Sequence, residues 1–292
     1  DVMTNIGFTY EGLKTLLPGR HQDLERFSTA FREGSEKRKE LNGDVGTSDP
    51  RHWRFGRAEQ AIHVVLTLYT SLAPDAPAFT NALQALRSGL SANGLREVHW
   101  ELAEALKDAQ GAYFDGVYFG YRDGFAQPRI AGQCETHKPD FQPAASPGEF
   151  LLGPNYKSIF GGPSIGKLPA DLATNGTFGA MRLIEQDVDL FDKTLVAGST
   201  QLQLTPQLVK AKLLGRWPGD QPLVLNEPAP VGDPRNDFDY APSWEYPKLD
   251  NDHKGETCPV GAHIRRANPR TALVAGQRHS RRLIRRGMPI AW

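Results

Sequence analysis

The amino-acid sequence predicts an α+β protein made of two similar halves. Near its start, the segment NIGFTYEGLKTLL (5–17) has the pattern of a short strand that enters an amphipathic helix. The segment QPAASPGE (142–149) is rich in proline and small residues, which is typical of a connector between domains. Beyond it, NGTFGAMRLIEQDVDLFDKTL (175–195) again has the pattern of a strand running into a helix. The same order of elements on both sides indicates two related halves, although the sequence shows no internal repeat.

Three further elements follow from local patterns. The apolar and β-branched run AIHVVLTLYT (61–70) predicts a largely buried strand. From 78 to 108 leucines recur at helical spacing, so we expect a helix, open to a break near Gly94. In TPQLVKAKLLG (205–215), Thr205 can cap a helix, Pro206 suits its first turn and Gly215 can end it.

Composition excludes several classes of function. The 292 residues carry 34 basic and 34 acidic side chains, so no strong net field directs the chain towards nucleic acid or membrane. No segment reaches the ~18 apolar residues of a membrane span, and the first residues lack the order of a secretory signal. We therefore expect a soluble protein, whose compartment and oligomeric state stay open.

The two cysteines, Cys134 and Cys258, form neither a disulfide framework nor a zinc pattern, although a single bridge between them stays open. The chain also lacks the CxxCH spacing that covalent haem attachment requires.

Eight arginines crowd into about twenty residues near the end of the chain. A solvated basic face is the more common explanation of such a cluster. The alternative is a pocket for an anion, such as a phosphate or the propionates of a cofactor. The cluster consists of Arg265, Arg266, Arg270, Arg278, Arg281, Arg282, Arg285 and Arg286.

Three segments could carry chemistry: GYRDGFAQP (120–128), CPVGAHIRRANPR (258–270) and RRLIRRGMP (281–289). Asp-Gly is a common turn dipeptide, so Asp123 either shapes a turn or is a carboxylate beside a closely approaching cofactor. His263 is either a structural histidine or an axial ligand of haem iron. Arg285 follows an apolar pair and could point into a pocket. From the residues alone, these three form only a permitted combination.

The three segments together resemble the dye-decolourising peroxidases, a family of haem peroxidases, and in particular its longer bacterial and fungal branch. GYRDGFAQP is similar to the GxxDG segment of that family, CPVGAHIRRANPR to its proximal histidine segment, and RRLIRRGMP to its distal arginine segment. Other stretches agree and occur in the family's order, namely GEFLLGP, NGTFGAMRLIEQDV, LLGRWPG and NDFDYAP.

The resemblance implies two ferredoxin-like domains, over 1–145 and 146–292, with a noncovalent b-type haem held against the second. It implies that His263 binds the iron, that Asp123 is the acid–base carboxylate and that Arg285, rather than Arg286, is the distal arginine. Gly124 and Phe125 would adjoin the haem beside Asp123. The implied partners are hydrogen peroxide and aromatic reductants such as dyes and phenolic compounds, oxidised in one-electron steps.

The chain departs from the family pattern at both ends. Family members have more strand-forming sequence before 5–17 and about a hundred more residues after the arginine segment, so we expect a fragment that lacks part of the haem pocket. The alternatives to an active peroxidase are a haem-handling protein without turnover and an inert fragment. Trp244 and Tyr246 are candidate electron relays, although packing is the more common role of such residues.

Overall fold

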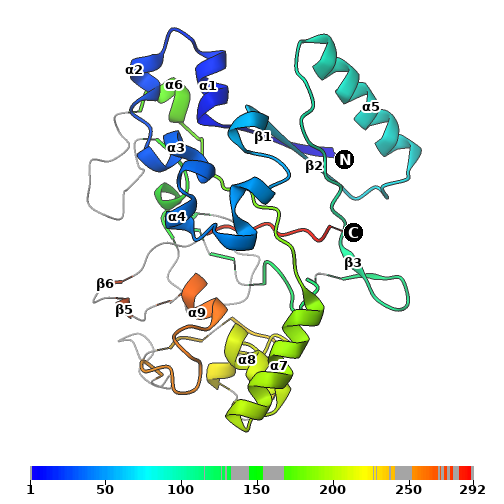
Figure 1. The fold of residues 1–292 in the computed structure, drawn as a ribbon, viewed down its shortest axis with the longest axis vertical. Helices are drawn as coiled ribbons and strands as arrows, with labels where there is room; N and C mark the ends of the chain where they lie inside the picture. The colour runs from blue at the N-terminus through cyan, green and yellow to red at the C-terminus, as the bar shows by residue number, and fades with distance from the viewer. Residues whose placement is uncertain are drawn as a thin grey trace. The chain divides into compact units, whose positions relative to one another are not determined.

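The structure is a computed structural model, and it divides into two compact units that are described one at a time (Figure 1). Unit 1 holds the described residues within 1–101, 152–154 and 163–179, and unit 2 holds those within 102–151, 155–162 and 180–292. The structure describes residues 2–114, 116–125, 127–128, 130–132, 145–153, 168–225, 227, 229–236, 238–240, 252–268, 270, 273–274, 277–278 and 283–290.

Unit 1 is built on an antiparallel strand pair. Strand β1 (Val2–Phe8) pairs with β2 (Val64–Thr70) along its whole length, with Val2 opposite Thr70 and Phe8 opposite Val64. Helix α1 (Tyr10–Leu16) begins directly after β1, because the Thr9 hydroxyl accepts a hydrogen bond from the Gly12 amide at 3.1 Å. These elements confirm the predicted strand–helix start. The second strand is half-buried rather than largely buried, since every residue of β2 is of intermediate exposure.

The remaining helices of unit 1 are short, with one exception. Helix α5 (Pro77–Ala92) is 16 residues long, so the break that the sequence left open near Gly94 is confirmed, while helix as far as 108 was wrong. It ends because Gly94 adopts a φ of +80° and the Leu95 amide reaches back to the Leu90 carbonyl, as in a Schellman cap. The short helices are α2 (His21–Leu24), α3 (Thr29–Lys37), α4 (Lys39–Asn42) and α6 (Ala170–Ala173).

Unit 2 contains the helices that position the candidate site. Helices α7 (Val188–Leu202) and α8 (Pro206–Leu214) pack together, and α9 (His263–Ala267) packs on α8. The short strands of this unit form two antiparallel pairs, β3 (Leu106–Lys107) with β4 (Tyr113–Phe114) and β5 (Leu273–Val274) with β6 (Gln277–Arg278).

The predictions for the start of the second half had mixed outcomes. The α8 prediction is confirmed in detail: the Thr205 hydroxyl accepts from the Leu208 amide, Pro206 opens the helix and Gly215 ends it with a φ of +89°. Residues 176–187, in contrast, form no strand, so the predicted strand before α7 was wrong. A strand needs a partner for its backbone groups, and none pairs with this segment among the described residues.

The core of unit 2 lies between α8, α9 and the segment that carries Phe238 and Tyr240. One buried cluster comprises Val224, Phe238, Tyr240, Cys258 and Ala262, with Ile264 of α9 packed against it. A second cluster joins α8 to Trp217 and Leu223. The predicted domain boundary at 145/146 lies inside unit 2. The two units are defined by compactness, whereas the predicted boundary separates two ferredoxin-like domains. The boundary therefore stays a prediction. Over the described part of the chain, no helix is both long and apolar enough to cross a membrane.

Gly215 ends α8 and lies against Ile264 of α9, and its replacement by alanine is expected to destabilise unit 2. A Cβ at this position would lie 2.5 Å from Cγ1 of Ile264, and the φ of +89° adds backbone strain. We expect the free energy of unfolding to fall by about 2–3 kcal/mol in urea titration. Gly132→Ala is the control, because Gly132 has a φ of +82° but no atom within 4 Å of its Cβ position. Equal effects of the two substitutions would contradict the proposed contact with Ile264.

Candidate active site

The loop that carries Asp123 is a tight turn whose shape depends on two glycines. Gly120 and Gly124 have φ values of +80° and +69°, which other residues rarely adopt. The Val117 amide donates to the Tyr121 carbonyl at 2.8 Å and closes the turn on one side. Asp123 therefore does lie in a turn, and its half-buried carboxylate is also available for contacts beyond the turn.

The Asp123 carboxylate holds the segment 283–290. Its Oδ2 accepts a hydrogen bond from the Gly287 amide at 2.8 Å, across 164 positions of sequence. A Cβ at position 287 would lie 2.0 Å from Oδ2, so only glycine permits this contact. Two of the three predicted segments therefore meet, and the arginine–glycine step of RRGMP has a structural reason.

Arg285 lies on the same segment, two residues before Gly287. Its backbone forms two hydrogen bonds with the side-chain amide of Gln127, which follows Asp123 in GYRDGFAQP. The residue is half-buried, and its guanidinium makes no hydrogen bond or ion pair with the described residues. A fixed backbone thus presents a cation that the described protein does not neutralise.

His263 is the first residue of α9 and lies on the wall of an open pocket of about 480 Å³. The pocket is lined by Leu213, Gly261, His263, Arg266 and Ala267. The pKa of His263 is lowered, first by partial desolvation and next by the positive charge of Arg285, while Asp123 raises it. The charges of the two other predicted site residues therefore act on this imidazole, which is held towards its neutral form.

The Asp123 loop is supported by residues that no sequence motif predicts. The Asn236 side-chain amide donates to the Phe125 carbonyl at 2.6 Å, and the buried Arg216 donates to Asn236 Oδ1. The guanidinium carbons of Arg122 and Arg216 lie 5.1 and 5.0 Å from the centre of the Phe125 ring. Arg216 lies in LLGRWPG and Asn236 in NDFDYAP, two stretches noted only for their resemblance to the family. No local sequence pattern predicts these contacts.

A second group of missed residues supports His263. The Arg265 guanidinium is buried and forms an ion pair with the buried Asp252 at 3.0 Å. It also donates to the backbone carbonyls of Asp252, His253 and Cys258. Asp252 in turn accepts from the Thr257 and Cys258 amides. The loop that leads into α9 is therefore fixed by one buried ion pair.

The arginine cluster is not a single basic face. Arg265 is buried in its ion pair, and Arg270 donates to the carbonyls of Asn236 and Phe238 while its guanidinium carbon lies 3.7 Å from the Phe238 ring centre. The interpretation as a solvated face was wrong for these two residues. Arg266 and Arg286 are exposed. Arg281, Arg282 and the side chain of Arg278 lie outside the described residues, as do Cys134, Trp244 and Tyr246. Cys258 is buried and has no disulfide partner in the described part of the chain.

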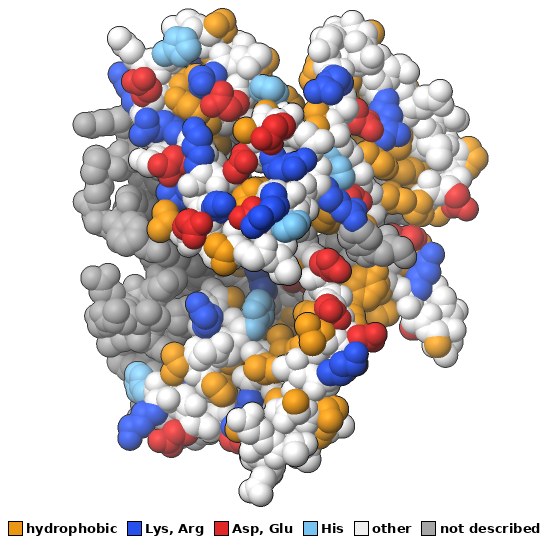
Figure 2. Space-filling model, in the orientation of Figure 1, with side chains coloured by type: hydrophobic (Ala, Val, Ile, Leu, Met, Phe, Trp, Pro, Cys, Tyr) orange, Lys and Arg blue, Asp and Glu red, His pale blue; other side chains and the backbone are white. Residues whose placement is uncertain are grey.

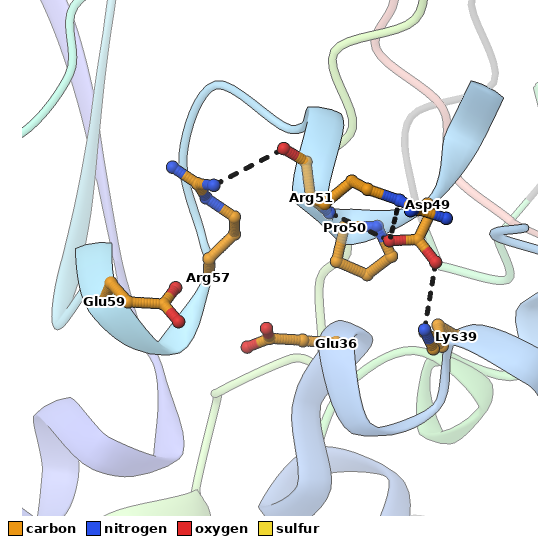
Figure 3. Close-up of a pocket in the computed structure, with 7 residues that line it drawn as sticks. All are labelled: Glu36, Lys39, Asp49, Pro50, Arg51, Arg57 and Glu59. Atoms are coloured by element: carbon orange, nitrogen blue, oxygen red, sulfur yellow. Dashed lines mark hydrogen bonds and ion pairs between the residues drawn. The ribbon is translucent and has the colours of Figure 1, made fainter. Parts of the chain in front are cut away.

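Unit 1 has a pocket of its own, about 350 Å³ in volume, that contains none of the predicted site residues (Figure 3). Asp49 pairs with Lys39 at 3.0 Å and with Arg51 at 3.3 Å, which satisfies the main cations on its wall. The Arg51 amide and Lys39 lower the pKa of Asp49. On the face drawn in Figure 2, basic and acidic side chains are interspersed over α3 and α4, so neither sign dominates there. The described wall of this pocket therefore has no set of residues that corresponds to Asp123, His263 and Arg285 of unit 2.

Comparisons with known proteins show what the chain resembles as a whole. No protein-family model matches the chain. A dye-decolorizing peroxidase of Mycena epipterygia is 29% identical over 98% of the chain and 52% of its own length. The chain thus spans about half the length of the curated relatives that it matches over most of its residues.

Solved structures show the same likeness in three dimensions. The DyP-type peroxidase of Anabaena sp. superimposes with a TM-score of 0.63 at 22% identity, over 93% of the chain and 54% of that protein. A dye-decolorizing peroxidase with an engineered heme pocket superimposes at 0.59 and 24% identity, over 92% and 56%. The predicted α+β, ferredoxin-like fold class is thereby confirmed. By sequence and by fold, the chain is similar to the dye-decolourising peroxidases.

Proposed function

We propose that the chain carries the catalytic groups of a haem-dependent peroxidase that uses hydrogen peroxide to oxidise dyes and phenolic compounds. The observation that carries this proposal is the convergence of Asp123, Arg285 and His263 within one compact unit. Asp123 contacts the segment of Arg285 directly, and the charges of both act on His263. Peroxide chemistry at a haem needs these three groups: a proton carrier, a fixed cation and an iron ligand.

A noncovalent b-type haem fits the groups around His263. The imidazole is exposed towards an open pocket, and its lowered pKa favours the neutral form that binds iron. Arg266 on the same pocket wall supplies a positive charge for a propionate. When bound, the haem would pass the two oxidising equivalents of hydrogen peroxide to the reductant in one-electron steps.

Asp123 carries the proton in this proposal. Its Oδ2 is oriented by the Gly287 amide, and its Oδ1 accepts no hydrogen bond from the described residues. The carboxylate can therefore accept the proton from one oxygen of hydrogen peroxide and return it to the other oxygen, which then leaves as water. Gly124 and Phe125 define the turn beside it, and we assign them to the wall of the haem site.

Arg285 stabilises charge in this proposal. Negative charge grows on the departing oxygen as the O–O bond breaks, and a guanidinium remains protonated at any working pH. Because its backbone is fixed and its guanidinium has no counter-ion among the described residues, Arg285 can serve this oxygen without first breaking an ion pair.

We also propose that the chain consists of two ferredoxin-like halves, 1–145 and 146–292. The haem would be held against the second half. The relatives are about twice as long as this chain, so dye oxidation and its aromatic reductants are proposed for the protein as a whole. We propose no role for nucleic acid or membrane.

The test is the absorption spectrum of the chain titrated with haem, followed by mixing with hydrogen peroxide. We expect a Soret band at one haem per chain and a rapid spectral change that Asp123→Asn and Arg285→Leu slow by about 10²–10³-fold. The control is Asp233→Asn, because Asp233 is an exposed aspartate of the same unit. A haem-bound protein whose peroxide reaction is unchanged in both site variants would contradict the two roles. Haem binding without any dye oxidation would favour a haem-handling protein.

A further inference from the structure

The segment 283–290 is held by its backbone. Beside the Gly287 contact with Asp123, the Pro289 carbonyl accepts from the Glu104 amide at 2.9 Å and the Ile290 carbonyl accepts from the Tyr118 hydroxyl at 3.1 Å. The segment belongs to no strand of the described structure. Backbone contacts place the chain independently of its side chains, so the position of Arg285 depends on the groups that bind its own peptide units.

Gln127 is the residue that binds both of these peptide units. Its Oε1 accepts from the Arg285 amide at 3.1 Å, and its Nε2 donates to the Arg285 carbonyl at 2.5 Å. The amide belongs to the peptide plane before the Arg285 Cα, and the carbonyl belongs to the plane after it. One side chain therefore fixes both dihedral angles of Arg285, as a paired strand residue does in an antiparallel sheet. These angles set the direction of the Cα–Cβ bond from which the guanidinium extends.

The local sequence is built to admit this contact. A Cβ at Gly124 would lie 3.3 Å from Gln127 Nε2, closer than most side-chain contacts, so the second glycine of GYRDGF leaves room for the amide. Both Gln127 and Arg285 are half-buried, which limits competition from water for these hydrogen bonds. Asp123 binds the backbone at position 287 and Gln127 binds it at position 285, and both residues belong to the same loop. This loop therefore fixes the proton carrier and the cation relative to each other.

We propose that Gln127 is the positioning residue of Arg285, and that its side-chain amide fixes the place of the guanidinium in the peroxide site. This inference rests on the proposed function, because it assigns the purpose of the contact to the step in which Arg285 stabilises charge. A displacement of about 1 Å at a catalytic group can cost about 10²-fold in rate. Gln127 therefore affects the reaction through Arg285 and not by contact with the peroxide.

The first measurement uses the chain without haem. Gln127→Leu removes both hydrogen bonds, and Gln127→Glu keeps an acceptor for the Arg285 amide but loses the donor to its carbonyl. We expect hydrogen exchange at the Arg285 amide to accelerate in Gln127→Leu and to stay slow in Gln127→Glu. Gln221→Leu is the control, since its Nε2 donates to the Gly232 carbonyl instead. Unchanged exchange at Arg285 in Gln127→Leu would overturn the proposal, whether or not the chain retains haem.

The second measurement is a double-mutant cycle on the haem-loaded chain. We expect Gln127→Leu to slow the peroxide reaction by about 10–10²-fold and to have no further effect in an Arg285→Leu background. A residue that only stabilises the fold would give additive effects in the cycle, and additivity would overturn the positioning role. If the wild-type chain bound no haem, the proposed function would fail, while the exchange experiment would still decide whether Gln127 holds Arg285.

Discussion

Replacing Asp252 by alanine is expected to lower the free energy of unfolding of unit 2 by about 3–5 kcal/mol. Asp252 and Arg265 are 5% and 4% exposed, so the substitution leaves a buried guanidinium without its counter-ion. It also leaves the Thr257 and Cys258 amides without their acceptor. The remaining carbonyl partners of Arg265 cannot supply a negative charge. Urea titration followed by tryptophan fluorescence measures this effect.

A matched control separates burial from mere pairing. Glu97 pairs with Arg87 at 2.7 Å, but the two side chains are 48% and 39% exposed. Glu97→Ala should therefore cost no more than about 1 kcal/mol, because solvent screens an exposed pair. A loss below 1 kcal/mol in Asp252→Ala as well would mean that the ion pair does not stabilise the loop before α9. If the pair does stabilise it, haem retention should also fall in Asp252→Ala, since His263 begins that helix.

The parts of the fold that the sequence predicted are those encoded locally. Helix α8 has its cap, its first-turn proline and its terminal glycine within eleven residues, and all three act as expected. The strand expected within 176–187 was wrong because a strand also depends on a partner elsewhere in the chain, which local pattern does not reveal. Helix α5 ends at Gly94, the break that the sequence left open, and leucine spacing alone could not decide between an end there and helix as far as 108.

In the candidate site, too, local motifs could be predicted from the sequence, whereas contacts between distant segments could not. Resemblance of short motifs predicted Asp123, His263 and Arg285 as site residues, which stays a prediction, and the structure places all three in unit 2. It could not identify Asn236 or Gln127 as supports, because each acts through a backbone group more than a hundred positions away. Contacts to backbone leave no pattern in the partner's side chains. Gly287 is the exception that could have been found, because a glycine directly after paired arginines indicates a close backbone approach.

Replacing His263 by alanine is expected to abolish stoichiometric haem binding, because no other described residue of the pocket wall supplies an imidazole. Absorption titration should show the wild-type Soret band replaced by a weak, unsaturable increase. His21→Ala is the matched control, since His21 is also exposed and also begins a short helix, but lies in unit 1. Retention of a saturable Soret band in His263→Ala would assign the iron ligand to another residue.

The acid dependence of haem binding provides an independent check on the same residue. Iron binds the neutral imidazole, so haem should dissociate as His263 becomes protonated. Desolvation and Arg285 lower the pKa of His263, so the neutral form persists to a lower pH than for a histidine with the ordinary pKa of about 6.5. Haem should therefore remain bound as the pH falls through 6.5 and leave only below it.

Arg285→Leu removes one of the two causes that lower the pKa of His263, so this variant should begin to lose haem at a higher pH than the wild type. An identical profile in both proteins would mean that the guanidinium does not act on this imidazole, and with it the electrostatic link between the two halves of the proposed site would be lost.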